Sequence, residues 1–267
     1  MSTVNNVYEF LKAIAPEEMA LESDNVGFLV GISDAAVEKI IVSLEITDDV
    51  IDEALNEGAE LIVTHHPLFK SLTSVNDTDK IGQKIVRMLS AGISAICMHT
   101  NLDAAQGGVN DTLAIAVGIA SADESAEPLP GCRYTEAGQA VSYGRVGYLQ
   151  KEYSISEYLD FLKTALDAKG FRYYDAGRDV RKVAISAGGG SDLWESALKS
   201  GCDTFITADM KYKLFLEAKE HNINLIDGGH FCTENLITRV LAEKLQLKFP
   251  DAHVFISKTH TQIVDFY

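Results

Sequence analysis

The chain has 267 residues, of which 46% are hydrophobic and 23% are charged, as expected for a globular protein with a full apolar core. It carries 23 Lys and Arg against 39 Asp and Glu, so its net charge of −16 repels polyanions, and we expect no nucleic-acid partner. No apolar stretch approaches the roughly 18 residues of a membrane span, and the first residues do not resemble a signal peptide, so we expect a cytoplasmic protein without membrane contact.

Short β-branched runs alternate with amphipathic helical patterns along the chain, which predicts an α/β fold with parallel or mixed sheets. The predicted strands are residues 39–46, 60–66, 93–99, 181–187, 203–208 and 223–227. The stretch from Ser121 to Gly147 breaks this alternation, because it is partly acidic and contains small residues and proline. We therefore predict two similar α/β lobes, residues 1–125 and 126–267, which form one intertwined domain and whose mixed sheets face a central cleft.

Residues that can bind a metal follow the predicted strands. His65 and His66 follow the run LIVT, Asp103 comes soon after AICM, and His230 and Glu234 follow LIDGG. Ligands of open α/β sheets gather beyond the carboxyl ends of the strands. One histidine at a strand end can simply make a hydrogen bond, but several such residues together favour a metal site.

The spacing of these residues suits two metal ions. Adjacent side chains at the end of a strand project in different directions, so His65 and His66 can serve different ions. His230 and Glu234 are four residues apart, which places them on one face of the first turn of a helix. Asp103 adds a carboxylate of the kind that bridges two cations. Three imidazoles and two carboxylates suit two divalent ions of Zn, Fe, Mn, Ni or Co and leave positions open for water or substrate.

Several motifs are similar to those of the Nif-three-like family, also called GTP cyclohydrolase I type 2 homologues. They are LESDNVGFLVG, VTHHPLFK, HTNLDAAQGGVNDTLA and DGGHFCTENLI, which together extend over nearly the whole chain. The resemblance implies a two-lobed α/β fold, a toroidal homohexamer and a dinuclear metal centre at His65, His66, Asp103, His230 and Glu234. The short connection at 121–150 resembles the form of the family without an inserted middle domain.

Two positions depart from the pattern of that family. At the junction between Ser23 and Asp24 of this chain, the family usually has a Trp. At the position of Lys213, the family often has a His. A protonated lysine does not readily ligate a metal. A substrate-binding or supporting role of that histidine therefore does not carry over to this chain.

Two classes of function fit these residues. The first is a metal-dependent hydrolase for a small phosphate-bearing or nucleotide-like substrate, in which two ions activate a bridging water and His99 is a catalytic proton shuttle. The second is a non-catalytic metal-storage, metallochaperone or scaffold protein that works as a ring. Cyclohydrolase activity is implied by the resemblance alone, because nothing in the sequence identifies a guanine pocket.

Glycines beside the predicted site have structural and functional interpretations. The run from Gly188 to Gly190 is either a tight turn or an anion-binding loop before a helix. Gly107 and Gly108 favour a sharp turn into a helix that begins near Val109, over a close approach to substrate. Lys211 and Tyr212 either face the cleft or are solvated.

The four cysteines, Cys97, Cys132, Cys202 and Cys232, have no C-x-x-C spacing. We expect reduced, buried thiols rather than disulfides or zinc ligands. Cys232 lies two positions after His230, so it points away from the face shared by His230 and Glu234, and we expect it to pack in the core.

Overall fold

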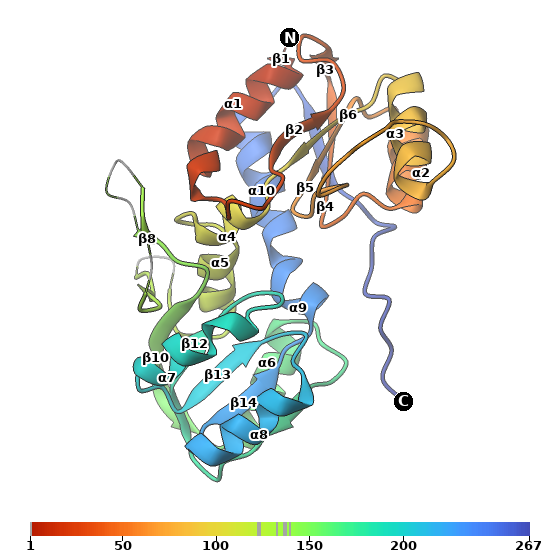
Figure 1. Cartoon of the computed structure of the whole chain (residues 1–267). Coiled ribbons are helices and arrows are strands. Elements are labelled where there is room, and N and C mark those ends of the chain that lie inside the picture. Colours follow the sequence, from red (N-terminus) through yellow and green to blue (C-terminus); the bar gives the residue numbers. More distant parts are fainter. Residues whose placement is uncertain (1, 122–123, 132, 136–137, 139) are drawn as a thin grey trace. The chain divides into compact units, whose positions relative to one another are not determined.

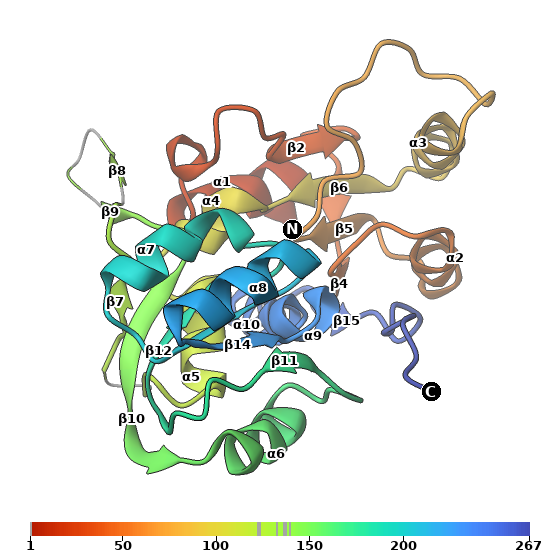
Figure 2. The ribbon, with the colours of Figure 1, turned by 60° about the horizontal axis from the view of Figure 1, so that its bottom comes forward.

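The structure is a computed structural model that describes residues 2–121, 124–131, 133–135, 138 and 140–267. The chain forms two compact units, which Figure 1 and Figure 2 show with the colours of the sequence. The first unit consists of Met1–Ala105 and Ile237–Thr261, and the second of Gln106–Leu236 and Gln262–Tyr267. These units differ from the division into 1–125 and 126–267 drawn from the sequence. The segment 237–261 belongs to the first unit because it supplies a strand to that unit's sheet.

The first unit is an α/β unit with one main sheet. Its elements are β1 (Ser2–Thr3), α1 (Val4–Ile14), η1 (Glu17–Met19), β2 (Gly27–Val30), β3 (Ala36–Val37), β4 (Lys39–Ser43), α2 (Asp48–Glu57), β5 (Leu61–Thr64), α3 (Lys80–Ser90), β6 (Ser94–Cys97), α4 (Thr100–Ala104), most of α10 (Leu236–Lys248), and β15 (His253–Ile256). The described strands of the main sheet follow the order β15-β4-β5-β6-β2. The first four run parallel, and β2 is antiparallel to β6.

Helices cover both faces of this sheet. Helices α2 and α3 lie on one face, and α1 and α10 lie on the other (Figures 1 and 2). Strands β4, β5 and β6 read as nearly continuous apolar runs because a parallel sheet buried on both faces has no polar side. On the face of α2 and α3, Ile41 and Ile62 pack with Ile51 and Met88 in one apolar cluster.

The second unit is also an α/β unit. Its elements are α5 (Val109–Ala116), β7 (Glu127–Pro128), β8 (Arg133–Tyr134), β9 (Ala140–Val141), β10 (Arg145–Tyr153), α6 (Ile155–Ala165), β11 (Arg172–Tyr174), β12 (Val180–Ile185), η2 (Ser191–Leu193), α7 (Trp194–Lys199), β13 (Thr204–Thr207), α8 (Tyr212–His221), β14 (Asn224–Asp227) and α9 (His230–Glu234). The described strands of its main sheet follow the order β11-β14-β13-β12-β10-β7. Strands β12, β13 and β14 are parallel, and the strands beside them are antiparallel.

Alternate residues of the parallel strands enter two different cores in this unit. Ile206 and Ile226 pack with α5 and α6, whereas their neighbours Phe205 and Leu225 pack with α7 and α8. This arrangement follows from the two-residue period of a strand, which sends successive side chains to opposite faces. The sheet is therefore buried between two helical layers.

The predicted mixed α/β architecture is confirmed, and each of the six predicted strands overlaps an observed strand. The observed strands are shorter than the predicted runs, and the candidate ligands lie in the turns or short helices that follow them. Strands β2, β10, β11 and β15 were not predicted, because polar and charged residues interrupt several of them or their apolar run is short. Within the described residues, no helix is both long and apolar enough to cross a membrane.

Candidate metal site

The parallel strands of the first unit end level with one another. Ser43 at the end of β4 pairs with Thr64 at the end of β5, and Thr64 pairs with Cys97 at the end of β6. The residues that follow these strands therefore leave the sheet at the same edge, as expected for a ligand site of a parallel sheet. His65 and His99 both lie there.

His65 is completely buried at this edge. Its Nδ1 lies 2.8 Å from the carbonyl oxygen of Met98, so Nδ1 carries the proton and donates it to that oxygen. The Nε2 atom lies 3.6 Å from Oδ1 of Asp103, which comes from α4. Two of the predicted ligands are thus neighbours in the structure.

The thiol of Cys97 supports the same turn. It donates to the carbonyl oxygen of His65 over 2.9 Å. Burial raises the pKa of this thiol well above its usual range, so Cys97 is a protonated donor. Cys97 therefore holds the backbone of His65.

His66 and His99 are both held through Nδ1 by carboxylates. His66 Nδ1 lies 3.0 Å from Oε1 of Glu45, a residue just beyond β4. His99 Nδ1 lies 2.8 Å from each carboxylate oxygen of Asp24, which also accepts a hydrogen bond from the backbone N–H of Thr100. Burial by itself would raise the pKa of Asp24, but hydrogen bonds from His99 and Thr100 hold it well below its usual range.

The three imidazoles converge on one another. The ring centroids of His65, His66 and His99 lie 5.0, 5.2 and 5.4 Å apart in pairs. One potential ligand atom from each ring lies within 4.8 Å of the other two. This group could hold a metal ion, and it includes His99, which the sequence analysis assigned to proton transfer.

The second unit brings His230 and Glu234 together on α9. Their Nε2 and Oε2 atoms are 3.0 Å apart, as their spacing of four residues predicts. The other ring nitrogen, Nδ1, lies 2.7 Å from Oδ2 of Asp209, in the turn after β13. The hydrogen bond to Glu234 is the main cause that raises the pKa of His230 to about 9, against the opposing effect of burial, and Asp209 raises it further.

Gly188 lets the backbone pass close to these two side chains. It has a φ of +58°, and a Cβ at this position would overlap the carboxylate of Glu234 and lie 3.2 Å from Nε2 of His230. Its N–H donates to Thr233, and the N–H of Gly190 donates to Thr207 and to the carbonyl oxygen of Gly188. These amides are used within the protein, which supports a tight turn rather than an anion-binding loop.

Several site residues were missed by the sequence analysis. Glu45, Asp24 and Asp209 each orient a histidine but come from segments far from it in sequence. His260 was also missed. It follows the unpredicted strand β15. Burial is the main cause that lowers its pKa, the charge of Glu45 opposes this shift, and the charge of His66 adds to it. In the sequence, Asp209 follows a predicted strand, Glu45 lies near the end of one and Asp24 lies within the motif LESDNVG, whereas His260 follows no predicted strand.

The structure also shows the surroundings of other residues that the sequence analysis named. The side chain of Lys213 is 85% exposed and pairs with Glu217 over 3.3 Å, and Tyr212 is also exposed. Gly108 caps α5, which begins at Val109 as predicted, and Gly107 has a left-handed φ of +67°. The turn at Gly107 and Gly108 is confirmed as a helix entry.

The cysteine predictions hold wherever the structure describes them. Cys97, Cys202 and Cys232 are free and buried, and Cys232 belongs to the core beneath α5 and α6. Cys132 lies outside the described residues.

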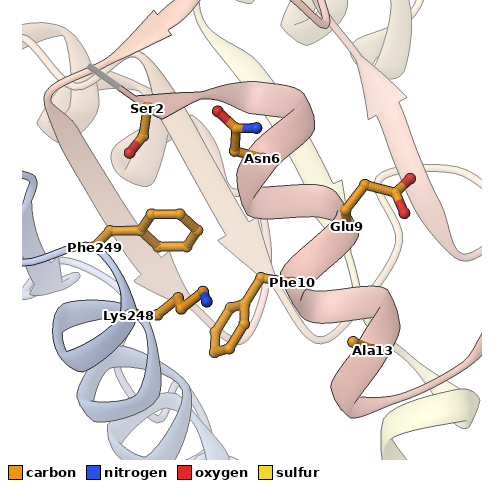
Figure 3. A pocket seen from close by; sticks show the side chains of 7 residues that line it. All are labelled: Ser2, Asn6, Glu9, Phe10, Ala13, Lys248 and Phe249. Atoms are coloured by element: carbon orange, nitrogen blue, oxygen red, sulfur yellow. The ribbon is translucent and has the colours of Figure 1, made fainter.

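The first unit also has a pocket that contains none of the predicted site residues (Figure 3). Its lining comes from β1, α1 and the chain at the end of α10: Ser2, Asn6, Glu9, Phe10, Ala13, Lys248 and Phe249. The rings of Phe10 and Phe249 meet edge to face with centroids 5.6 Å apart. Figure 3 shows both rings at this pocket.

The fold and these side chains define a two-unit α/β protein with histidines and carboxylates at the carboxyl ends of its strands. A family model described as Duf34/NIF3 (NGG1p interacting factor 3) matches residues 2–263. The chain therefore belongs to the Duf34/NIF3 family.

Several known proteins are similar to this chain over most of its length. A relative from Clostridium perfringens, named GTP cyclohydrolase 1 type 2 homolog, is 34% identical over 261 residues, with 96% of each chain covered. A relative of the same name from Clostridium acetobutylicum is 33% identical, with 91% of this chain and 89% of the relative covered. The crystal structure of a Bacillus cereus protein related to NIF3 superposes with a TM-score of 0.87 at 23% identity, covering 100% of this chain and 99% of that one. This last similarity concerns the fold.

Proposed function

We propose that the protein binds two divalent metal ions and is a metal-dependent hydrolase for a small phosphate-bearing or nucleotide-like substrate. The proposed ligands are His65, His66, Asp103, His230 and Glu234. The ions are of Zn, Fe, Mn, Ni or Co, for which mixed imidazole and carboxylate ligands are suited.

One observation carries the metal-binding part of the proposal: four histidines are each anchored through Nδ1 by an oxygen acceptor. The acceptors are the Met98 carbonyl and the carboxylates of Glu45, Asp24 and Asp209, for His65, His66, His99 and His230. An imidazole whose Nδ1 is fixed in this way coordinates a metal through Nε2, and such outer partners are typical of metal-ligating histidines. The donor set therefore fits divalent metal ions.

The chain's own residues would orient the ligands and handle protons. Bound metal ions would supply a water of lowered pKa and polarise the bond under attack. Asp24 keeps the His99 ring in one orientation and tautomer, as required for the proposed transfer of a proton by His99. The negative charge of the whole chain disfavours phosphate-bearing substrates, and bound cations would reverse that field locally.

Metal analysis followed by a substrate panel tests this function. Protein purified without chelators and reloaded with its native metal should contain close to two ions per chain. It should hydrolyse at least one member of a panel of phosphoesters and nucleotides, and chelation should abolish this activity. One ion or none would remove the dinuclear proposal. Two ions without turnover would favour the second function, a metal-storage, metallochaperone or scaffold protein.

We also propose that the protein assembles as a toroidal homohexamer, from its resemblance to the family. A closed ring would let the metal sites of several chains share a cavity that admits only small substrates. Sedimentation velocity at physiological salt should give a species near six chains, or about 175 kDa from the chain mass of 29.1 kDa. A monomer across micromolar concentrations would refute this assembly and leave the metal chemistry to be judged separately.

A further inference from the structure

The histidines of the first unit make up a set of metal donors without any residue of the second unit. His65, His66 and His99 all belong to the first unit, where their potential ligand atoms lie within 4.8 Å of one another. They come from the ends of two adjacent parallel strands, β5 and β6, whose last residues pair in register. The sheet itself therefore holds the three rings together.

The distances between these atoms are within reach of one ion. A tetrahedral ion with bonds of about 2.1 Å separates its ligand atoms by about 3.4 Å, so the nitrogens must approach by at most about 1.4 Å. The side chains of His66 and His99 are 17% and 23% exposed, which leaves room for this adjustment. His65 is buried and held by Met98, so it provides the fixed position.

Three imidazoles with a further open position are a well-known ligand number for a divalent ion. The groups that hold these rings also favour metal binding. The carboxylates of Glu45 and Asp24 add negative charge behind His66 and His99, two of the three donors. Oδ1 of Asp103 lies 3.6 Å from Nε2 of His65, the nitrogen that would bind the ion.

We propose that the first unit alone binds one divalent metal ion through His65, His66 and His99, with Asp24 as the positioning residue of His99. The inference rests on the proposed function, because it concerns how the same metal site is filled. It identifies a state with one ion per chain in which His99 is a ligand. The proton-transfer role of His99 then belongs to the fully loaded protein.

The test removes the candidate ligands of the second unit and counts the ions that remain. The full-length double variant His230→Ala/Glu234→Ala is titrated with Co²⁺, with elemental analysis for stoichiometry and visible absorption for coordination. We expect about one Co²⁺ per chain and a visible band of a low-coordinate nitrogen site. Adding His99→Ala to this variant should weaken Co²⁺ binding at least about tenfold.

A matched control substitutes a histidine at the other end of the same sheet. His253 is exposed and begins β15, so it lies at the amino edge, whereas the site lies at the carboxyl edge. Adding His253→Ala to the double variant should leave Co²⁺ binding unchanged. Because Glu234 is buried, the pair His230→Gln/Glu234→Gln provides a second background that preserves side-chain volume. Circular dichroism without metal checks the fold of each variant.

The outcomes separate this inference from the proposed function. If the wild type binds two ions and both double variants are folded but bind none, the inference is wrong and the proposed function stands. If His99→Ala leaves the remaining Co²⁺ as tightly bound as before, the three-imidazole set is also wrong. A wild-type chain that binds no ion contradicts both.

Discussion

The Nδ1 atom of His99 lies 2.8 Å from both carboxylate oxygens of Asp24, whose side chain is only 5% exposed. The same carboxylate accepts hydrogen bonds from the backbone and side chain of Thr100, the first residue of α4. A buried carboxylate with this many donors stays ionised. Asp24 therefore connects the segment before β2 to the turn after β6 and fixes one imidazole of the candidate site.

Asp24→Asn should weaken metal binding while the protein remains folded. The amide removes the negative charge behind His99 and cannot accept all the hydrogen bonds that Asp24 accepts. We expect a loss of metal affinity of about 10-fold to 100-fold, measured by competition with a chromogenic chelator. The control is Asp34→Asn, an exposed aspartate whose substitution should not alter the affinity. Equal affinity of the two variants would show that Asp24 has only a structural role.

Glu234→Ala and His65→Ala should each lower metal content without unfolding the protein. Both residues lie in turns or short helices beyond the strands, while the apolar cores lie beneath them. Elemental analysis should show fewer ions per chain, and far-ultraviolet circular dichroism of metal-free protein should match the wild type. A variant that is unfolded under conditions in which metal-free wild type is folded would indicate a structural site.

Gly188→Ala should disrupt the His230 and Glu234 pair. The added Cβ would overlap the buried Glu234 carboxylate, and the residue must also keep a φ of +58°. The matched control is Gly201→Ala, because Gly201 has a φ of +67° but nothing within 4 Å of an added Cβ. We expect Gly201→Ala to cost about 1 kcal/mol in urea unfolding and to keep its metal. Gly188→Ala should cost more and lose metal, so equal behaviour of the two variants would refute the steric role.

Glu53→Gln should destabilise the protein in a pH-dependent manner. Glu53 accepts hydrogen bonds from Ser257, Lys258 and Thr259, which follow β15. Burial would raise the pKa of Glu53, but these hydrogen bonds prevail and lower it below its usual 4.5. A lowered folded-state pKa contributes stability that is present above the usual pKa and is lost as the pH falls below it.

The difference in unfolding free energy between wild type and Glu53→Gln should thus be about 1 kcal/mol at pH 7 and shrink below pH 4.5. Urea unfolding at several pH values measures it. Glu57→Gln, an exposed position on the same helix, should show no such dependence. A difference that grows in acid would contradict the role of the Glu53 carboxylate.

Local pattern was sufficient to predict the central strands and the candidate ligands that follow them. Strands such as β5 and β13 are buried on both faces, so their apolar runs are visible without knowledge of their partners. The contact between His230 and Glu234 was predictable because it depends only on the helical spacing of four residues.

Tertiary structure decided which residues hold those ligands in place. Asp24, Glu45 and Asp209 lie 75, 21 and 21 residues from the histidines they orient. Sequence periodicity describes only neighbours along one element, so it cannot reveal such pairs. The need for glycine at position 188 likewise arises from the approach of Glu234 on α9, 46 residues later, to the turn after β12.

The assignment of β15 to the first unit has the same physical basis. Its four residues begin with a histidine and are only partly buried, so they show no continuous apolar run, and their place depends on parallel pairing with β4, more than 200 residues earlier. That pairing brings the segment after β15, with His260, to the edge of the sheet where His66 lies. Local sequence thus determined the ligand types and the strands that carry them. Hydrogen bonds and strand pairing between distant segments decided how those ligands are oriented.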